Sequence, residues 1–217
     1  MCKINLKKSK KLKILISNGP TRIYLDPIRY ITNISSGKMG ASLARAACQF
    51  AEVCVVNANV NRDYADAEVL DVETNTEMLE VLTNKIEETN IFISVAAVVD
   101  FEPIRSLKSK IKNIKQLKFK ATVDILKTLA LNKRSDQMIV GFALETENLL
   151  ENALVKLREK NLDIIIANRA SESMEKDRAS VIVIAKDGRK TVFEQVPKDE
   201  LAHNILDIIL ANYLWEN

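Results

Sequence analysis

The chain has 217 residues, of which 47% are hydrophobic and 28% charged, so it can form one compact domain and is too apolar for a disordered chain. Its 32 basic and 29 acidic residues leave a net charge of +3, which by itself gives no indication of a nucleic-acid partner. Three cysteines with no CxxC pair and a single histidine exclude a disulfide framework and a zinc site, and no apolar run approaches a membrane span.

The predicted elements alternate between short apolar strands and longer helices. In chain order, strands are expected at 12–17, 52–57, 91–98, 138–144, 162–167 and 181–185, and helices at 36–50, 76–88, 124–132, 147–160 and 198–214. Asp124 is the predicted N-cap of its helix. The Asp187-Gly188 turn leads into a last strand at 191–196, which predicts an antiparallel hairpin.

This alternation predicts an α/β fold: a Rossmann-like, mostly parallel sheet covered by helices on both faces, with a C-terminal antiparallel hairpin. We expect one domain over 1–217 with a basic, flexible N-terminus at 1–11. Cys48 and Cys54 have apolar neighbours and are expected to be inert core thiols in a reducing, cytoplasmic protein without a membrane role. Ligands of such a sheet bind beyond the carboxyl ends of the strands, here after Ser17, Val98 and Leu144.

The five glycines exclude two familiar nucleotide motifs. No two of them are spaced as GxG, so the dinucleotide fingerprint is absent. The triplet Ser36-Gly37-Lys38 lacks the upstream glycine and the following Ser/Thr of a P-loop. No tyrosine is followed four residues later by lysine, a pair that short-chain dehydrogenases need. Common nicotinamide chemistry is therefore disfavoured.

Two segments indicate an anionic ligand. The small residues at 33–37 run into a helix start, where backbone N–H groups favour an anion, although a serine N-cap with closely packed glycines explains the same pattern. Residues 102–120 carry seven basic side chains against Glu102, and six lysines lie among the first thirteen residues. Either basic stretch alone is also typical of solvated surface.

Several blocks match one family in order and spacing. DPIRYITNISSGKMG at 26–40 closely resembles the signature of the phosphopantothenoylcysteine synthetases. AAVVDF at 96–101, KIK at 110–112, VGFALETEN at 140–148 and KLREKNLDIIIAN at 156–168 resemble further blocks of that family. The resemblance spans about residues 12–185.

The resemblance implies a ligase of coenzyme A biosynthesis. Members condense 4′-phosphopantothenate with L-cysteine, usually with CTP in bacteria and ATP in eukaryotes, through an acyl-nucleotide and with Mg²⁺. It also implies a homodimer with the loop of Asn33 near the partner subunit. Related bacterial chains carry an N-terminal flavin-dependent decarboxylase, for which we expect no room here.

The resemblance also assigns the site. Asn33 and Lys110 are expected to be catalytic, Asn33 as a neutral donor to the reacting acyl group and Lys110 as a mobile cation for the triphosphate. The phosphate or substrate loop is Ser35, Ser36 and Gly37. Nucleotide-binding residues are expected to be Ser94, Val95, Ala96, Asp100, Lys110, Val123, Asp124, Ile125, Leu126, Phe142, Lys156 and Lys160.

The chain departs from the family in two places. Val123 replaces the proline of its P-D-I-[VL] block, and the segment around Met174 lacks its usual phenylalanine. The metal ligands and the role of Lys198 stay open. Two other functional classes also stay open: an NAD(P)- or flavin-binding oxidoreductase, and a non-catalytic nucleotide or nucleic-acid binder supported only by the clustered lysines.

Overall fold

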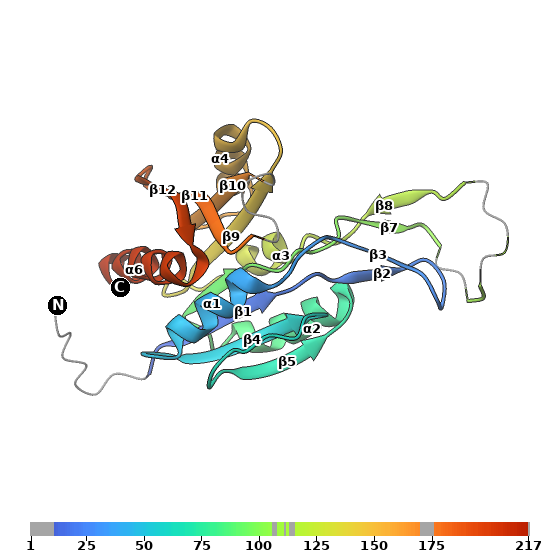
Figure 1. Ribbon diagram of the computed structural model, residues 1–217, viewed down its shortest axis with the longest axis horizontal. Coiled ribbons are helices and arrows are strands. Elements are labelled where there is room, and N and C mark those ends of the chain that lie inside the picture. Colours follow the sequence, from blue (N-terminus) through green and yellow to red (C-terminus); the bar gives the residue numbers. More distant parts are fainter. Residues whose placement is uncertain (1–10, 106–107, 111, 113–115, 170–175, 217) are drawn as a thin grey trace.

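An eight-stranded sheet forms the centre of the molecule in the computed structural model, which describes residues 11–105, 108–110, 112, 116–169 and 176–216 (Figure 1). Its strands, in spatial order, are β12 (Lys190–Pro197), β11 (Arg178–Ala185), β10 (Ile164–Arg169), β9 (Met138–Glu145), β6 (Ile91–Ser94), β1 (Lys13–Asn18), β4 (Glu52–Ala58) and β5 (Glu68–Val72). All pairings from β10 to β5 are parallel, whereas β11 and β12 are antiparallel. The predicted parallel sheet and its C-terminal hairpin are confirmed.

Helices cover both faces of this sheet, as predicted. On one face lie α1 (Lys38–Ala47) and α6 (Lys198–Glu216), and on the other lie α2 (Asn75–Ile86), α3 (Ile125–Leu131) and α4 (Leu149–Glu159). Successive residues of a strand point to opposite faces, so in β1 Ile14 and Ile16 join the first core cluster and Leu15 the second. Burial on both faces explains why the strands read as unbroken apolar runs.

Local capping fixes where two of the helices begin. The Asp124 side chain accepts a hydrogen bond from the Lys127 N–H at 3.0 Å, which confirms its predicted N-cap position. Thr74 and Glu77 form a reciprocal capping box at the start of α2. The strand predicted at 91–98 is shorter than expected: β6 ends at Ser94 and residues 95–98 continue as a loop.

Two small hairpins project from the sheet and were not predicted. One pairs β2 (Arg22–Tyr24) with β3 (Tyr30–Thr32), and the other pairs β7 (Phe101–Pro103) with β8 (Phe119–Ala121). We call them the two arms; both extend to the right in Figure 1. An edge-to-face contact between Phe101 and Phe119, with ring centroids 5.4 Å apart, connects the two strands of the second hairpin.

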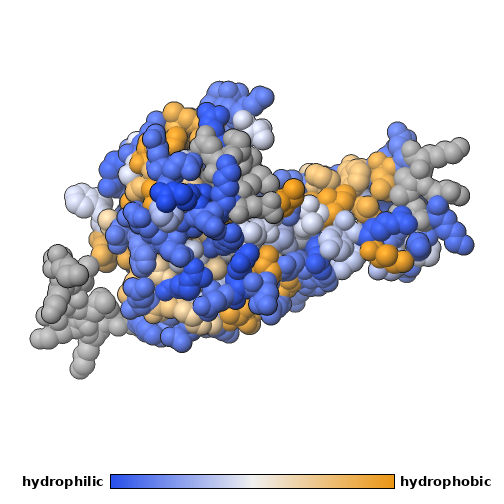
Figure 2. Space-filling model, viewed as in Figure 1, coloured by the Kyte–Doolittle hydropathy of each residue, from blue (hydrophilic) through white to orange (hydrophobic). Residues whose placement is uncertain are grey.

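The arms expose apolar side chains. Ile28 is 61% exposed at the tip of the first hairpin, and Phe101, Ile104 and Phe119 are 45%, 52% and 41% exposed on the second. Figure 2 shows this apolar surface on the projecting end of the molecule. Among the helices that the structure describes, none is long and apolar enough to cross a bilayer.

Candidate functional site

A cavity of about 860 Å³ opens at the carboxyl ends of the parallel strands. It lies where the chain order reverses, because β1 is flanked by β4 on one side and β6 on the other. Such switch points are where doubly wound sheets bind ligands, and the volume is in the range of small-molecule sites. The cavity is therefore in the region that the fold class predicts.

The loop after β6 forms one wall and is tied closely to β1. The backbone N–H groups of Val95 and Ala97 donate to the carbonyls of Ser17 and Gly19 at 3.1 and 2.9 Å. Asn33 reaches across from the first arm and donates from Nδ2 to the Val98 carbonyl at 2.9 Å. The predicted residues Ser94, Val95, Ala96 and Asn33 consequently share one rigid rim of the cavity.

The predicted phosphate loop leads into α1 and rests on a buried asparagine. Gly37 is the N-cap in the left-handed region, with φ 68°, and its carbonyl accepts from Asn18 Nδ2 at 3.2 Å. Gly40 is equally constrained, because a Cβ there would lie 2.2 Å from Asn18 Oδ1. Asn18 is 1% exposed and also donates to the Tyr64 hydroxyl at 2.8 Å. Both glycines are therefore required for the close approach of α1 to β1.

Three lysines of the cavity are held by carboxylates. Lys156 Nζ lies 2.6 Å from Glu145, Lys160 Nζ 2.8 Å from Asp124, and Lys38 Nζ 2.5 Å from Asp177. Each of these carboxylates fixes the direction of a mobile ammonium group before any ligand arrives. An anion that binds these lysines has to compete with the carboxylates that hold them.

Apolar side chains complete the lining near α3 and β9. Ile125 is buried, whereas Leu126 and Phe142 are half-buried and Val123 is 59% exposed. Phe142 packs against the first core cluster while its outer part faces the cavity. This side of the cavity can hold an aromatic base or an aliphatic chain.

The structure brings together all but one of the predicted site residues. Asn33, the loop residues Ser35 to Gly37, and the predicted nucleotide-binding residues other than Lys110 line the cavity. Lys110 does not line it: this side chain is exposed in the segment between β7 and β8, on the second arm. Met174 and Lys115 lie outside the described residues.

Sequence reasoning missed several polar residues of the cavity, among them Asn18, Lys38, Asn168 and Lys198. Lys38 was visible within the signature run, and Asn18 directly follows the first predicted strand. The sequence showed Lys198 only as a residue at the start of the last helix, because the residues that surround it in space lie far away in the chain.

One carboxylate of the cavity, that of Asp100, is available to a metal ion. The described part of the chain contains no group of three or more side chains that could hold a metal by themselves. Asp100 is exposed at the cavity, and Asp124 is occupied by Lys160 and the start of α3. Mg²⁺ commonly uses one or two carboxylates plus substrate phosphates, and Asp100 suits that pattern.

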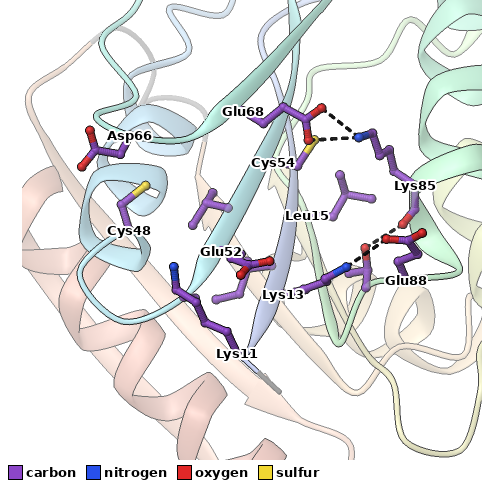
Figure 3. A pocket seen from close by; sticks show the side chains of 14 residues that line it. Lys11, Lys13, Leu15, Cys48, Glu52, Cys54, Asp66, Glu68, Lys85 and Glu88 are labelled. Carbon is purple, nitrogen blue, oxygen red and sulfur yellow. Dashed lines mark hydrogen bonds and ion pairs between the residues drawn. The ribbon is translucent and has the colours of Figure 1, made fainter. Parts of the chain in front are cut away.

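A second hollow, of about 410 Å³, lies at the amino ends of β1, β4 and β5 (Figure 3). Its charged side chains pair with one another: Lys13 with Glu88 and Lys85 with Glu68, each at 2.9 Å. Cys48 and Cys54 are half-buried free thiols that pack against the two core clusters and also line this hollow, so their expected apolar neighbours are confirmed although neither is fully buried. Burial raises the pKa of the Cys54 thiol to about 11, which makes it unreactive at neutral pH.

The chain resembles known proteins over nearly its whole length. Residues 9–213 match the family described as DNA/pantothenate metabolism flavoprotein C-terminal domain. The coenzyme A biosynthesis bifunctional protein of Bacillus subtilis is 38% identical over 209 residues, covering 91% of this chain and 51% of that protein. Its Escherichia coli counterpart is 36% identical over 222 residues, covering 96% and 54%.

A solved structure agrees with these relatives. The crystal structure of the C-terminal domain of a coenzyme A biosynthesis bifunctional protein matches with a TM-score of 0.78 at 36% identity. The match covers 94% of this chain and 96% of that domain. The chain spans about half the length of the curated relatives it matches.

Proposed function

The chain belongs to the family of the DNA/pantothenate metabolism flavoprotein C-terminal domain, and from this membership we propose that it is a phosphopantothenate–cysteine ligase of coenzyme A biosynthesis. Its substrates in this proposal are 4′-phosphopantothenate, L-cysteine and CTP. The proposed reaction belongs to the cytoplasm, in keeping with the free thiols of Cys48 and Cys54.

The proposed reaction has two steps. A carboxylate oxygen of phosphopantothenate attacks the α-phosphorus of CTP, the bond to the β-phosphate breaks, and pyrophosphate leaves with an acyl-cytidylate remaining. The cysteine amine then attacks the acyl carbon, CMP leaves with the bonding electron pair, and the amide nitrogen loses one proton. Neither step requires a nucleophilic side chain of the enzyme.

The observation that carries this proposal is the cavity at the strand ends, with its four lysines and its phosphate loop. Negative charge builds on phosphoryl oxygens during nucleotidyl transfer, so fixed cations and helix starts lower the barrier. The loop Ser35 to Gly37, followed by α1, faces the same space as Lys156 and Lys160.

We assign Asn33 to the reacting acyl group. Its side chain is anchored through Nδ2 to the Val98 carbonyl and adds no charge to the cavity. Nδ2 also makes a long contact of 3.4 Å with the Ala97 carbonyl, and the second amide N–H can exchange this contact for the carbonyl oxygen of the acyl-cytidylate. A neutral donor suits this position because a carboxylate would repel both substrates.

For Lys110 and the arms, we propose a homodimer. The arms expose Ile28, Phe101, Ile104 and Phe119 in one region, and surface of this kind is typical of an interface. Lys110 is on the second arm, away from the cavity of its own chain. A catalytic role for Lys110 therefore requires movement of the arm or a neighbouring copy.

Mg²⁺ is proposed as a companion of CTP. When bound, it neutralises phosphate charge and orients the α-phosphate. Asp100 is the side chain that would face it, and Lys156 and Lys160 contribute positive charge to the same cavity. The side chains of Val123, Ile125, Leu126 and Phe142 would enclose the base and ribose.

The test is an assay of the purified protein with phosphopantothenate, cysteine, Mg²⁺ and either CTP or ATP. We expect CMP and pyrophosphate to be released in equal amounts with formation of the amide, and pyrophosphate to form without cysteine in a single turnover. The Lys110→Gln variant should lower CTP–pyrophosphate exchange and keep the fold. No turnover with either nucleotide would refute the proposal.

The same preparation separates the two rival functions. A nicotinamide or flavin absorbance that copurifies with the protein would favour the oxidoreductase. A steeply salt-dependent affinity for DNA or RNA would favour the nucleic-acid binder. Either result together with absent ligation would replace the proposed function.

A further inference from the structure

A cluster of three cations surrounds the start of α1 at one end of the cavity. Lys38 and Lys198 line the cavity, and Arg62 lies behind the loop, where Nε donates to the Ser36 carbonyl at 2.7 Å. Lys38 is the first residue of α1 and Lys198 the first of α6, so two packed helices present their first turns to the same space. The cluster is therefore built from three segments distant in sequence.

Lys198 is the unusual member because it is a buried charge. Its residue is 9% exposed, and its backbone N–H donates to the Asp177 carbonyl at 2.9 Å. Burial lowers the pKa of its ammonium group, repulsion from Lys38 and Arg62 lowers it further, and Asp177 opposes them. A cation in such surroundings is stabilised by neighbouring anions, whether side chains of the protein or a bound ligand.

The packing of α6 keeps Lys198 at the cavity. The next residue, Asp199, accepts hydrogen bonds from Ser42 Oγ and Arg45 Nη2 of α1, both at 2.6 Å. That carboxylate is thus committed to joining the two helices. Of the charged groups that shift the pKa of Lys198, in the described part of the chain, Asp177 is the single acidic one.

Asp177 has the features of a replaceable counter-ion. Its side chain is 87% exposed, and it pairs with Lys38 at 2.5 Å. An exposed ion pair contributes little to stability, so a multiply charged anion can take over the cation at low cost. The pair also connects β11 to α1 across the edge of the cavity.

We propose that Lys198 and Lys38 form a phosphate subsite of the cavity and that Asp177 occupies it as an internal competitor until the phosphate group binds. This inference rests on the proposed ligase function of the same cavity. Two sources of phosphate fit it: the β- and γ-phosphates of the nucleoside triphosphate and the phosphate monoester of the acid. Lys198 acts there as a binding residue, and Asp177 regulates affinity by releasing Lys38.

Calorimetric titration of inorganic pyrophosphate into the whole protein tests the subsite without turnover. Removing a charge-assisted hydrogen bond should weaken pyrophosphate binding about 10- to 100-fold in Lys198→Gln. Lys198→Arg should restore most of the affinity. Lys85→Gln removes a lysine from the second hollow and should bind pyrophosphate as the wild type does. Unchanged affinity in Lys198→Gln, with an unchanged melting temperature, would overturn the subsite.

Competition by Asp177 is tested by a variant that should strengthen phosphate binding instead of weakening it. Asp177→Asn should tighten pyrophosphate binding about two- to tenfold, and this gain should vanish in Lys38→Gln, because the carboxylate then has no cation to release. A gain that persists without Lys38, or no gain at all, would refute the competition. Lys38→Gln also reports on the subsite if Lys198→Gln fails to fold.

Two further ligands identify the source of the phosphate. A loss in Lys198→Gln for CTP but not for phosphopantothenate assigns the subsite to the nucleotide, and the reverse assigns it to the acid. If pyrophosphate binding depends on Lys198 but the wild type ligates with neither CTP nor ATP, the subsite stands and the proposed function fails. If ligation proceeds and Lys198→Gln binds every ligand normally, the proposed function stands and the subsite fails.

Discussion

The two ends of the parallel sheet carry similar numbers of charged side chains but differ in the surroundings of those charges. At the carboxyl ends, Lys38, Lys156 and Lys198 face a cavity together with the phosphate loop. At the amino ends, Lys13 and Lys85 are matched by Glu88 and Glu68 across a smaller hollow (Figure 3). At both ends lysines are paired with carboxylates, but the first end also has helix starts that direct backbone N–H groups into the cavity.

The direction of the helices produces this difference. α1 and α3 begin at the cavity, and their first turns direct backbone N–H groups into it. α1 ends at Cys48, which lines the second hollow, so the negative end of the helix dipole lies there beside the hollow's carboxylates. In a parallel sheet every crossover helix runs opposite to its strands, so anions are attracted to one end and repelled from the other.

The largest expected effect is on chemistry at the carboxyl end. Asn33→Ala should lower the rate of amide formation about 100-fold, because one donor to the acyl-cytidylate is lost. Nucleotide affinity should change much less. Asn132→Ala, at the opposite end of α3, is the control and should retain full activity. A wild-type rate for Asn33→Ala in single-turnover measurements would contradict its assigned role.

A smaller effect is expected on stability at the support of the phosphate loop. Gly40→Ala places a methyl group 2.2 Å from Asn18 Oδ1, and the resulting displacement of α1 should lower the free energy of unfolding by about 1–3 kcal/mol. Urea unfolding measures this loss. In the Asn18→Ala background the same substitution should cost less, since the obstructing side chain is gone. Equal losses in both backgrounds would show that the contact is not the cause.

The smallest effect on function is expected from the second hollow. The Cys54 thiol has a pKa of about 11 instead of 9, so its thiolate fraction at about pH 8 is roughly 100-fold below that of the unfolded chain. Iodoacetamide should therefore modify Cys54 slowly, with a rate that rises with pH towards 11, as followed by peptide mass spectrometry. Ligase activity should survive modification of Cys54. Rapid modification at neutral pH would contradict the raised pKa of the Cys54 thiol. Inactivation that follows modification would show that this hollow takes part in function.

The sequence by itself determined the fold class and most of the site. Apolar strands alternating with helices are a local pattern, and burial on both faces of a parallel sheet requires it. The signature at 26–40 predicted Asn33 and the phosphate loop, since these residues are close in sequence and line the same cavity. The N-cap at Asp124 was equally readable, because its hydrogen bond reaches only three residues ahead.

Only the tertiary structure decided the rest. The arms consist of three-residue strands, too short for any period to appear in the sequence. Lys110 belonged to a matching block, yet the direction of its arm keeps it away from the cavity of its own chain. Lys198 looked like an ordinary helix start until the packing of α6 on α1 buried it beside Lys38, 160 residues earlier. Burial and the proximity of other charges depend on how the elements pack, so no local sequence pattern predicts them.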